Sequence, residues 1–428
     1  MTCRLILVLI CGFLSAGAHA QTTDTATREL VQRLLTRIDT LEKRVLELEH
    51  ERAPVAPHPA PPDHVAGTQA AHAQHDQVML EGTQPSYPSL KMSGFSDFNF
   101  SGTDLRAPAT GFSQQTLLRP QSGFQEGQFI LHFSSALSPR VSFFGELSFT
   151  ARPDAGQGIP AATGFNAEVE RAIIRFDQSD RLKVSFGRYH TPINYWNTAF
   201  HHGQWLQTTI SRPEMSQFGG GFIPVHFIGA LAEGALPAGG LNLNYNVGVG
   251  NGRGSVISRG GDFGDINNNR AWLANVFIRP NSLYALQVGG SVYRDEVNPL
   301  TGPPTREWIQ SAHIVWHKEN PEFIAEFANA SHRSILSSET SHSQAWYLQT
   351  AFRLPWNGRA WKPYYRFEYT HVPNSDTLFR AVPTFNASTG GVRYDLTTFA
   401  ALKFELRRYN RRNLPDISGA FTQVSFTF

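Results

Sequence analysis

The sequence predicts an all-β protein, a 16-stranded antiparallel transmembrane β-barrel preceded by a short α-helical coiled coil. Charged residues make up only 17% of the 428 residues, below the roughly 25% usual for soluble domains. Beyond the N-terminus, no run approaches the ~20 apolar residues of a spanning helix. A closed barrel is the membrane class that remains. The formal charge of +2 also gives no sign of the clustered basic surface typical of nucleic-acid binding, so no nucleic-acid partner is expected.

Residues 1–20 are typical of a secretory signal peptide. Arg4 precedes an uncharged, mostly apolar run, and small residues lead up to Ala20, which completes the three-part pattern of such signals. We expect cleavage after Ala20. Because Cys3 and Cys11 leave with the signal, the mature chain is expected to have no disulfide and no cysteine metal site or nucleophile.

Residues 21–52 contain a predicted periplasmic coiled coil. Apolar residues recur at alternating spacings of three and four, with β-branched residues at a positions and leucine at d positions. The a/d pattern alone favours two strands, but a doubled Arg-h-x-x-h-Glu pattern resembles the motif of trimeric coiled coils and favours a homotrimer. The alternative is one amphipathic helix lying on the barrel mouth. The residues expected at the oligomer interface are Val31, Leu34, Arg37, Ile38, Leu41, Glu42, Arg44, Val45, Leu48 and Glu49.

Residues 53–89 form a predicted linker rich in proline, alanine, histidine and glutamine, because no apolar period is present to support a packed core. It contains His58, His64, His72 and His75. Imidazole is the commonest metal ligand, so a zinc or copper site is one interpretation. The spacings fit no usual ligand pattern, and we expect neither a metal nor a cofactor.

Residues 90–428 divide into segments of alternating apolar and polar residues, the pattern of barrel strands. The expected strands are 90–101, 123–137, 139–152, 165–177, 181–190, 223–236, 240–250, 270–280, 282–295, 305–317, 321–333, 342–354, 359–371, 389–395, 398–409 and 417–428. Links after even-numbered strands are short, and most links after odd-numbered strands are long. This sorting is typical of a barrel with periplasmic turns and external loops.

The alternation also predicts which side chains face inward. In 398–409, Leu402, Phe404 and Leu406 share one face, and the charged residues share the other. A lysine or arginine at the lipid midplane costs about 2–4 kcal/mol, so the charged face should line the lumen. Sixteen strands leave an aqueous channel. The expected pore-lining residues are Arg171, Arg175, Lys183, Lys362, Arg366, Glu368, Arg393, Asp395, Lys403, Glu405 and Arg407.

These faces carry eight basic side chains against five acidic ones when Glu146 and Glu326 are included. Rings of charge select ions by sign, so the count predicts a weak anion preference. The alternative is that the alternating charges form cross-strand ion pairs, which stiffen the wall.

The last segment, 417–428, alternates to its final Phe428 and resembles the recognition signal of bacterial outer-membrane proteins. That resemblance implies insertion by the barrel assembly machinery. The whole arrangement resembles Gram-negative outer-membrane porins, most nearly the phosphate-selective porin-like group, with local matches at 187–192 (GRYHTP) and 391–396 (GVRYDL). The resemblance implies a trimer of barrels and a third external loop that folds into the pore. A phosphate-type lysine ladder is not visible, so phosphate specificity is not inferred.

The third long link, 191–222, fits that constriction loop. We expect an eyelet of mixed charge with an aromatic slide, and the alternative is that its aromatic residues pack against the barrel wall or the trimer interface. The residues concerned are Tyr195, Trp196, His201, His202, Trp205, Arg212 and Glu214.

The predicted function is an outer-membrane porin for passive diffusion of small hydrophilic solutes, in contact with membrane lipid and lipopolysaccharide and with its coiled coil in the periplasm. No histidine motif has the spacing of a nucleophile–base pair, so no enzyme activity is expected. The alternative function is an outer-membrane anchor or cell-wall tether, in which the coiled coil and linker bind a periplasmic polymer such as peptidoglycan and the barrel serves as support.

Overall fold

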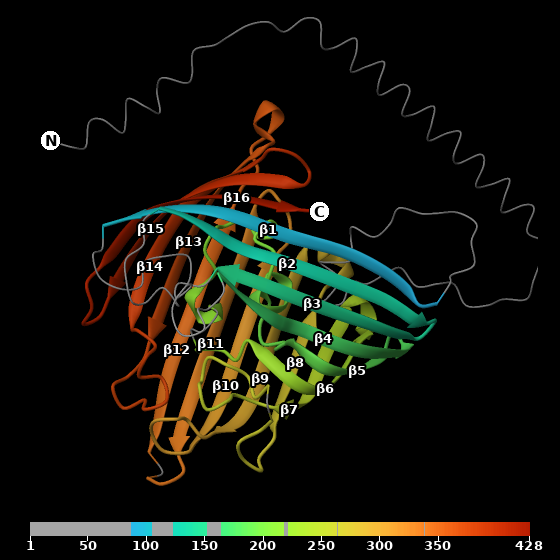
Figure 1. Ribbon diagram of the computed structural model, residues 1–428, viewed down its shortest axis with the longest axis vertical. Helices are drawn as coiled ribbons and strands as arrows, with labels where there is room; N and C mark the ends of the chain where they lie inside the picture. Colours follow the sequence, from blue (N-terminus) through green and yellow to red (C-terminus); the bar gives the residue numbers. More distant parts are fainter. Residues whose placement is uncertain (1–86, 105–122, 152–163, 218–220, 263, 338) are drawn as a thin grey trace, which may run out of the picture. The chain divides into compact units, whose positions relative to one another are not determined.

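The computed structural model describes residues 87–104, 123–151, 164–217, 221–262, 264–337 and 339–428 (Figure 1). The predicted signal peptide, the coiled coil and all of the linker before residue 87 lie outside these residues. Among the described residues, no helix is long and apolar enough to cross a membrane.

Sixteen β-strands make up the described chain. They are β1 (Ser89–Thr103), β2 (Gly123–Ser138), β3 (Val141–Ala151), β4 (Phe165–Ser179), β5 (Leu182–His190), β6 (His226–Leu236), β7 (Leu243–Asn251), β8 (Ala271–Ile278), β9 (Leu286–Val297), β10 (Thr305–Trp316), β11 (Glu322–Ser334), β12 (Thr340–Ala351), β13 (Trp361–His371), β14 (Phe385–Asp395), β15 (Ala400–Arg411) and β16 (Ile417–Thr427). Each strand pairs with its neighbour in the sequence, and β1 pairs antiparallel with β16 to close the ring. The predicted 16-stranded antiparallel barrel is confirmed.

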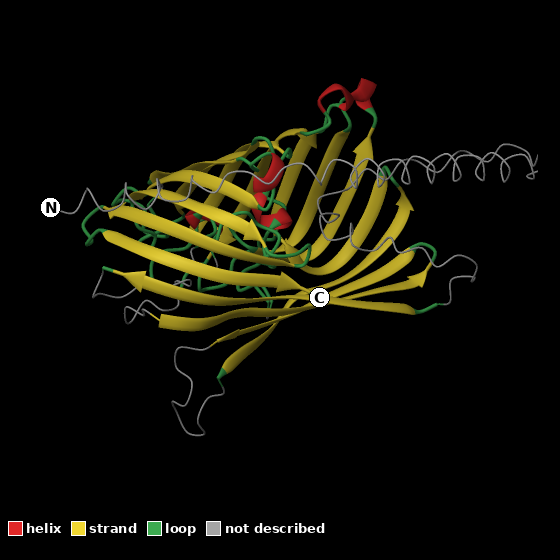
Figure 2. Cartoon of the chain, turned by 90° about the horizontal axis from the view of Figure 1, so that it is seen from above, coloured by secondary structure: helices red, strands yellow, loops and turns green. Residues whose placement is uncertain are grey.

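Short helical segments occupy the connections. They are α3 (Trp196–Ala199), η3 (Glu214–Ser216), η4 (Ala238–Gly240), η5 (Asn281–Leu283) and η6 (Trp356–Gly358). Seen from above, helical turns and loops lie inside the ring of strands (Figure 2). The interior of this barrel is therefore partly filled by its own connections.

Four predicted strand starts differ from the structure by three or four residues: β7 begins at Leu243 instead of residue 240, β9 begins at Leu286 instead of residue 282, and the other two follow long loops. β6 begins at His226 instead of residue 223, because the backbone N–H of Ile223 donates to Met215 O within the preceding loop, 3.4 Å away. β14 begins at Phe385 instead of residue 389, because Phe385 already pairs with Thr370 of β13. Both positions lie at the ends of long loops, where tertiary contacts decide how far the pairing runs.

The alternation of β15 matches the prediction from sequence. Lys403 and Glu405 have no exposed surface, whereas Leu402, Phe404 and Leu406 are 41%, 42% and 54% exposed. Successive side chains of a strand point to opposite faces of the sheet. The charged faces are thus turned into the barrel and the apolar faces away from it.

A β-bulge interrupts the pairing of β3 with β4. Glu146 pairs with Arg171 while the next residue, Leu147, pairs with Val169, so Glu170 is an extra residue in β4. A bulge shifts the alternation of its strand by one position. Glu170 and Arg171, although adjacent, are therefore both buried inside the barrel, each 4% exposed. Strict alternation from Arg171 does not predict the inward position of Glu170.

Candidate pore constriction

The connection between β5 and β6, residues 191–225 and called the third loop below, crosses the interior of the barrel. Near its start, the backbone N–H of Asn194 donates to Ser291 Oγ of β9 at 3.2 Å. In its middle, the N–H of Ile210 donates to Glu405 Oε2 of β15 at 2.9 Å. These contacts join the loop to strands far away in the sequence, so it folds inward, as the porin resemblance implied.

The beginning of the third loop is held by Glu326 of β11. Its Oε1 accepts hydrogen bonds from the backbone N–H groups of Tyr195 and Trp196, each at 2.7 Å, where a carboxylate satisfies donors at the start of the helical turn α3. The Trp196 ring is fully buried and meets Tyr347 edge-on, with ring centroids 6.0 Å apart. Tyr195 and Trp196 therefore pack the loop against the wall, the alternative to an aromatic slide.

The middle of the loop is held by three basic side chains of β13, β14 and β15. Arg366 donates to Ser211 O at 2.8 Å and Arg212 O at 3.0 Å. Arg393 donates to Trp205 O at 2.6 Å. Lys403 donates to Gln207 O at 2.8 Å and Thr209 O at 3.1 Å. All three were predicted to line the pore, and in the structure they bind backbone carbonyls of the loop.

Two carboxylates on the same strands bind the backbone N–H groups of the loop. Glu405 accepts from Ile210 at 2.9 Å and from Ser211 at 3.3 Å, and Glu368 accepts from the N–H of Glu214 at 2.7 Å. Charge-assisted hydrogen bonds of this kind are about twice as strong as neutral ones. We call Arg366, Glu368, Arg393, Lys403 and Glu405 the clamp. Its basic side chains donate to backbone carbonyls of the loop, and its carboxylates accept from backbone N–H groups of the loop.

Most of the other predicted pore-lining residues form ion pairs on the wall. Arg171 pairs with Glu146 at 2.5 Å, and both are buried. Lys362 pairs with Glu322 at 2.6 Å. The remaining pairs are Arg175 with Asp177, Asp395 with Arg393 and Arg353, and Arg407 with Glu405, and Lys183 is half-buried. Cross-strand pairing, the alternative offered by the sequence, thus describes part of this set.

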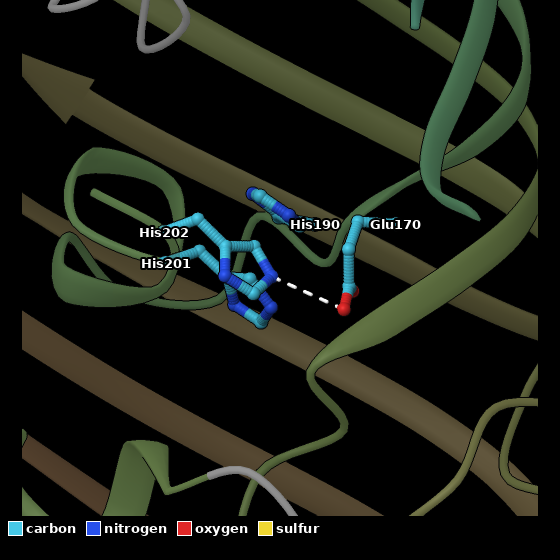
Figure 3. Close-up of side chains that lie close together, drawn as sticks. All are labelled: Glu170, His190, His201 and His202. Atoms are coloured by element: carbon cyan, nitrogen blue, oxygen red, sulfur yellow. Dashed lines mark ion pairs between the residues drawn. The ribbon is translucent and has the colours of Figure 1, made fainter. Parts of the chain in front are cut away.

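The two ends of the third loop meet in a group of histidines beside β4 (Figure 3). This imidazole cluster comprises Glu170, His190 at the end of β5, His201 and His202 in the loop, and His226 at the start of β6. His202 Nε2 lies 3.3 Å from Glu170 Oε1, and His226 Nε2 lies 2.8 Å from Glu170 Oε2. The rings of His190 and His201 stack with centroids 3.7 Å apart.

Burial, together with the adjacent imidazoles and Arg212, holds the pKa of His201 well below its usual range. Arg212 itself donates to the carbonyl of His201 at 2.9 Å. Of the cluster, only His201 and His202 were predicted to lie at the constriction, because the prediction considered the loop without the strands on either side of it. Histidines at both strand ends that flank the longest loop, His190 and His226, were the available signal for the other two.

Glycine is required at position 187, just before this cluster. Gly187 has φ of +139°, and a Cβ there would lie 1.9 Å from Ala172 O of β4. Glycine alone adopts such a backbone conformation readily. The close approach of β5 to β4 brings His190 toward Glu170, and it gives a physical reason for the glycine in the matched segment 187–192.

The buried charges are nearly balanced. In the described part of the chain, the buried acidic residues are Asp97, Glu146, Glu170, Asp295, Glu307, Glu326, Glu368, Asp376 and Glu405, and the buried basic residues are Arg171, Arg212, Arg253, Lys362, Arg366, Arg393, Lys403 and Arg407. Nine acidic against eight basic residues do not repeat the basic excess counted from the sequence. The missed acidic residues are Asp97, Glu170, Asp295, Glu307 and Asp376, and of these Glu170 lies in the bulge of a strand whose inward face had been predicted from Arg171.

Comparison with solved structures shows the fold. The anion-selective porin from Comamonas acidovorans superposes with a TM-score of 0.55 at 11% identity, over 80% of this chain and all of that one. The outer membrane channel DcaP of Acinetobacter baumannii gives 0.54 at 9% identity, over 82% of this chain and all of that one. The trimer form of OmpT from Vibrio cholerae, folded in vitro, gives 0.52 at 9% identity, over 80% and 100%. No family model and no curated protein matches the sequence. The chain thus shares the porin barrel fold without detectable sequence kinship.

Proposed function

We propose that the protein is an outer-membrane porin of a Gram-negative bacterium, which lets small hydrophilic solutes diffuse passively. The observation that carries the proposal is the third loop held across the interior of a closed 16-stranded barrel. A barrel of this size encloses more space than its own side chains fill, and a loop inside it limits what passes. Apolar exposed faces, as on β15, suit lipid contact.

The assembly belongs to the same proposal. A homotrimer of barrels is supported by the coiled-coil pattern of residues 21–52 and by the similarity to a protein described as a trimer form. The coiled coil would lie in the periplasm, joined to the barrel by the linker 53–89. Lipopolysaccharide, outer-membrane lipid and the assembly machinery that reads the terminal strand are the partners that such a barrel would meet.

Ion selectivity is proposed to be weak. The sequence count favoured anions, and one structural neighbour is named as an anion-selective porin. The nearly equal numbers of buried acidic and basic residues do not support a strong preference for ions of one sign. The charged side chains of the clamp bind backbone atoms of the loop, which weakens their effect on passing ions. We therefore propose a weak anion preference and no catalytic role.

Single-channel recording in planar lipid bilayers tests the proposal. The purified protein should give discrete conductance steps, and a gradient of potassium chloride should give a small reversal potential with the sign of anion selectivity. Absence of steps from correctly folded protein would contradict the channel itself. A reversal potential with the sign of cation selectivity would contradict only the anion preference.

Deleting residues 21–89 separates the porin from a periplasmic tether. A porin should still conduct without this segment, because the described barrel carries both the wall and the third loop. A tether would lose its function. No feature of the described residues favours the tether.

A further inference from the structure

The imidazole cluster contains four side chains whose geometry suits a metal ion. Glu170, His190, His201 and His202 each offer one ligand atom, and these atoms all lie within 4.8 Å of one another. All four residues are buried. Figure 3 shows the three rings and the carboxylate converging from β4, from the end of β5 and from the third loop. Neither the sequence prediction nor the porin fold accounts for this convergence.

We propose that Glu170, His190, His201 and His202 form a binding site for a divalent transition-metal ion, of which Zn²⁺ fits best. Three imidazole nitrogens and one carboxylate oxygen make a four-coordinate set, and Zn²⁺ binds such ligands at about 2.0–2.2 Å in tetrahedral geometry. Ligand atoms in that geometry lie about 3.3–3.6 Å apart. Small rotations of side chains therefore bring the present spacing to that of a bound ion.

The surroundings of His201 fix which ring nitrogen faces the site. Asn197 donates from Nδ2 to the backbone carbonyls of Thr191 and Val225, at 2.9 and 3.1 Å, so its side-chain oxygen must be the atom directed at His201. That oxygen lies 2.9 Å from His201 Nδ1. The proton is then on Nδ1, and the Nε2 lone pair is the ligand. Hydrogen bonds of this kind orient metal-binding histidines in known sites.

His202 and Glu170 have comparable support. Gln128 Oε1 of β2 lies 3.3 Å from His202 Nδ1, while His202 Nε2 lies 3.3 Å from Glu170 Oε1. His226 Nε2 lies 2.8 Å from the other carboxylate oxygen of Glu170. Glu170 Oε1 thus lies beside His202, and Oε2 lies beside His226, a histidine outside the proposed ligand set.

Three nearby arginines have partners other than the Glu170 carboxylate, and one of them, Arg188, also contacts His226 Nδ1 of the cluster at 3.1 Å. Arg171 pairs with Glu146 at 2.5 Å, Arg212 donates to the backbone carbonyl of His201, and Arg188 pairs with Glu168 at 2.9 Å. The Glu170 carboxylate makes its ion pairs with imidazoles. A dication at this position would meet one buried carboxylate directly and a second, Glu146, 3.5 Å from His190 Nε2.

A bound ion would join β4, the end of β5 and the first half of the third loop. Three chain segments, at residues 170, 190 and 201–202, would be linked at one point. The ion would fix the side of the loop that the clamp does not reach.

Metal titration of the full-length mature chain tests the site. The four linker histidines are first replaced (H58Q, H64Q, H72Q and H75Q) to remove adventitious binding. The protein is purified in detergent, stripped with a chelator and titrated with Co²⁺, which reports tetrahedral coordination through its visible absorption, and then with Zn²⁺. We expect one Co²⁺ per chain with a tetrahedral spectrum, displaced by one Zn²⁺. Less than half an equivalent bound would overturn the proposal.

Substitutions locate the ion. E170Q and H201Q should each weaken Zn²⁺ binding at least tenfold, with the far-ultraviolet circular dichroism of the barrel unchanged. The matched control is H342Q, which changes an exposed histidine of β12 and should leave the affinity unchanged. Equal affinity in E170Q, H201Q and H342Q would refute the assignment.

A direct measurement keeps the proposal testable if the variants fail to fold. X-ray absorption spectroscopy of the Zn²⁺-loaded, linker-substituted chain should show only nitrogen and oxygen ligands, with scattering from three imidazoles. Fewer than two imidazoles around the ion would contradict the site.

Discussion

The third loop is attached to the barrel in two different ways. On the side of β13–β15, the clamp holds it through basic and acidic side chains that bind backbone carbonyls and N–H groups, as Arg366 binds Ser211 O and Glu405 binds the N–H of Ile210. On the side of β4–β6, the imidazole cluster holds it through contacts between side chains, as His202 contacts Glu170. The same loop thus depends on its backbone at one attachment and on its side chains at the other.

The difference teaches which positions can vary. A clamp that binds the backbone tolerates other side chains in the loop, because every residue supplies a carbonyl and every residue except proline supplies an N–H. The cluster requires histidine at particular positions. The clamp also acts through side chains that bind backbone atoms, whereas the imidazoles of the cluster offer ring nitrogens that can bind a metal ion. Substitutions on the two sides should therefore differ in size and in their response to chelators.

The largest effect is expected for Arg366→Met. The variant loses donors to Ser211 O and Arg212 O and leaves Glu368, 3.3 Å away, as a buried carboxylate without its partner. Removing one member of a buried ion pair costs about 3–5 kcal/mol. Chemical unfolding in detergent should show a loss of this size, and conductance should rise as the loop loosens. Arg359→Met, in the exposed β12–β13 turn, is the control, and equal stability of the two variants would break the comparison.

A smaller loss is expected for Glu326→Gln. The amide oxygen still accepts from the N–H groups of Tyr195 and Trp196, but its charge is gone. Hydrogen bonds to charged groups contribute about 1.5–3 kcal/mol and neutral ones about 0.5–1.5, so the free energy of unfolding should fall by about 1–2 kcal/mol. Tryptophan fluorescence during unfolding measures it. No change would mean that the start of the loop is held by packing of Trp196 alone.

His202→Gln should cost about 1 kcal/mol in chelator-treated protein. It removes one contact of Glu170, whose other oxygen still meets His226, and a single hydrogen bond contributes about this much. With excess Zn²⁺ present, the difference from the unsubstituted chain should grow, because the latter alone gains the full binding energy of the ion. An equal loss of stability with Zn²⁺ and with chelator would show that the attachment at the imidazole cluster, like the attachment at the clamp, does not depend on a metal ion.

The smallest effect is expected for Gln204→Ala. Gln204 is half-buried, and its clamp contact is its backbone carbonyl, which accepts from Lys403. Alanine keeps that carbonyl but removes the side-chain oxygen that accepts from Gln207 Nε2, so the free energy of unfolding should fall by only about 0.5–1 kcal/mol, the lower part of the range for one neutral hydrogen bond. The free energies of unfolding of Gln204→Ala and Arg366→Met, measured by equilibrium unfolding under the same conditions, provide the check. A loss of stability comparable to that of Arg366→Met would show that side chains of the loop, and not only its backbone, contribute to the attachment at the clamp.

Much of the fold could be predicted because its signals are local. The alternation along β15 and the short links after even-numbered strands depend on neighbours in the sequence, and all sixteen strands are present. The bulge at Glu170 could not be predicted, because it is defined by a mismatch with β3, a partner strand. The histidines flanking the third loop were visible, but nothing in their spacing shows that the two ends of a 35-residue connection meet.

The sequence by itself determined the class of barrel, its number of strands and the inward direction of the charged side chains, since period-two patterning follows from strand geometry alone. Only the tertiary structure decided what those charges bind. Arg366 and Glu405 contact loop residues more than 150 positions away, and the gain from such contacts depends on where the loop is placed by the whole ring. Glu170, His190, His201 and His202 become one site for the same reason, because a fold can join donor atoms that sequence spacing keeps apart.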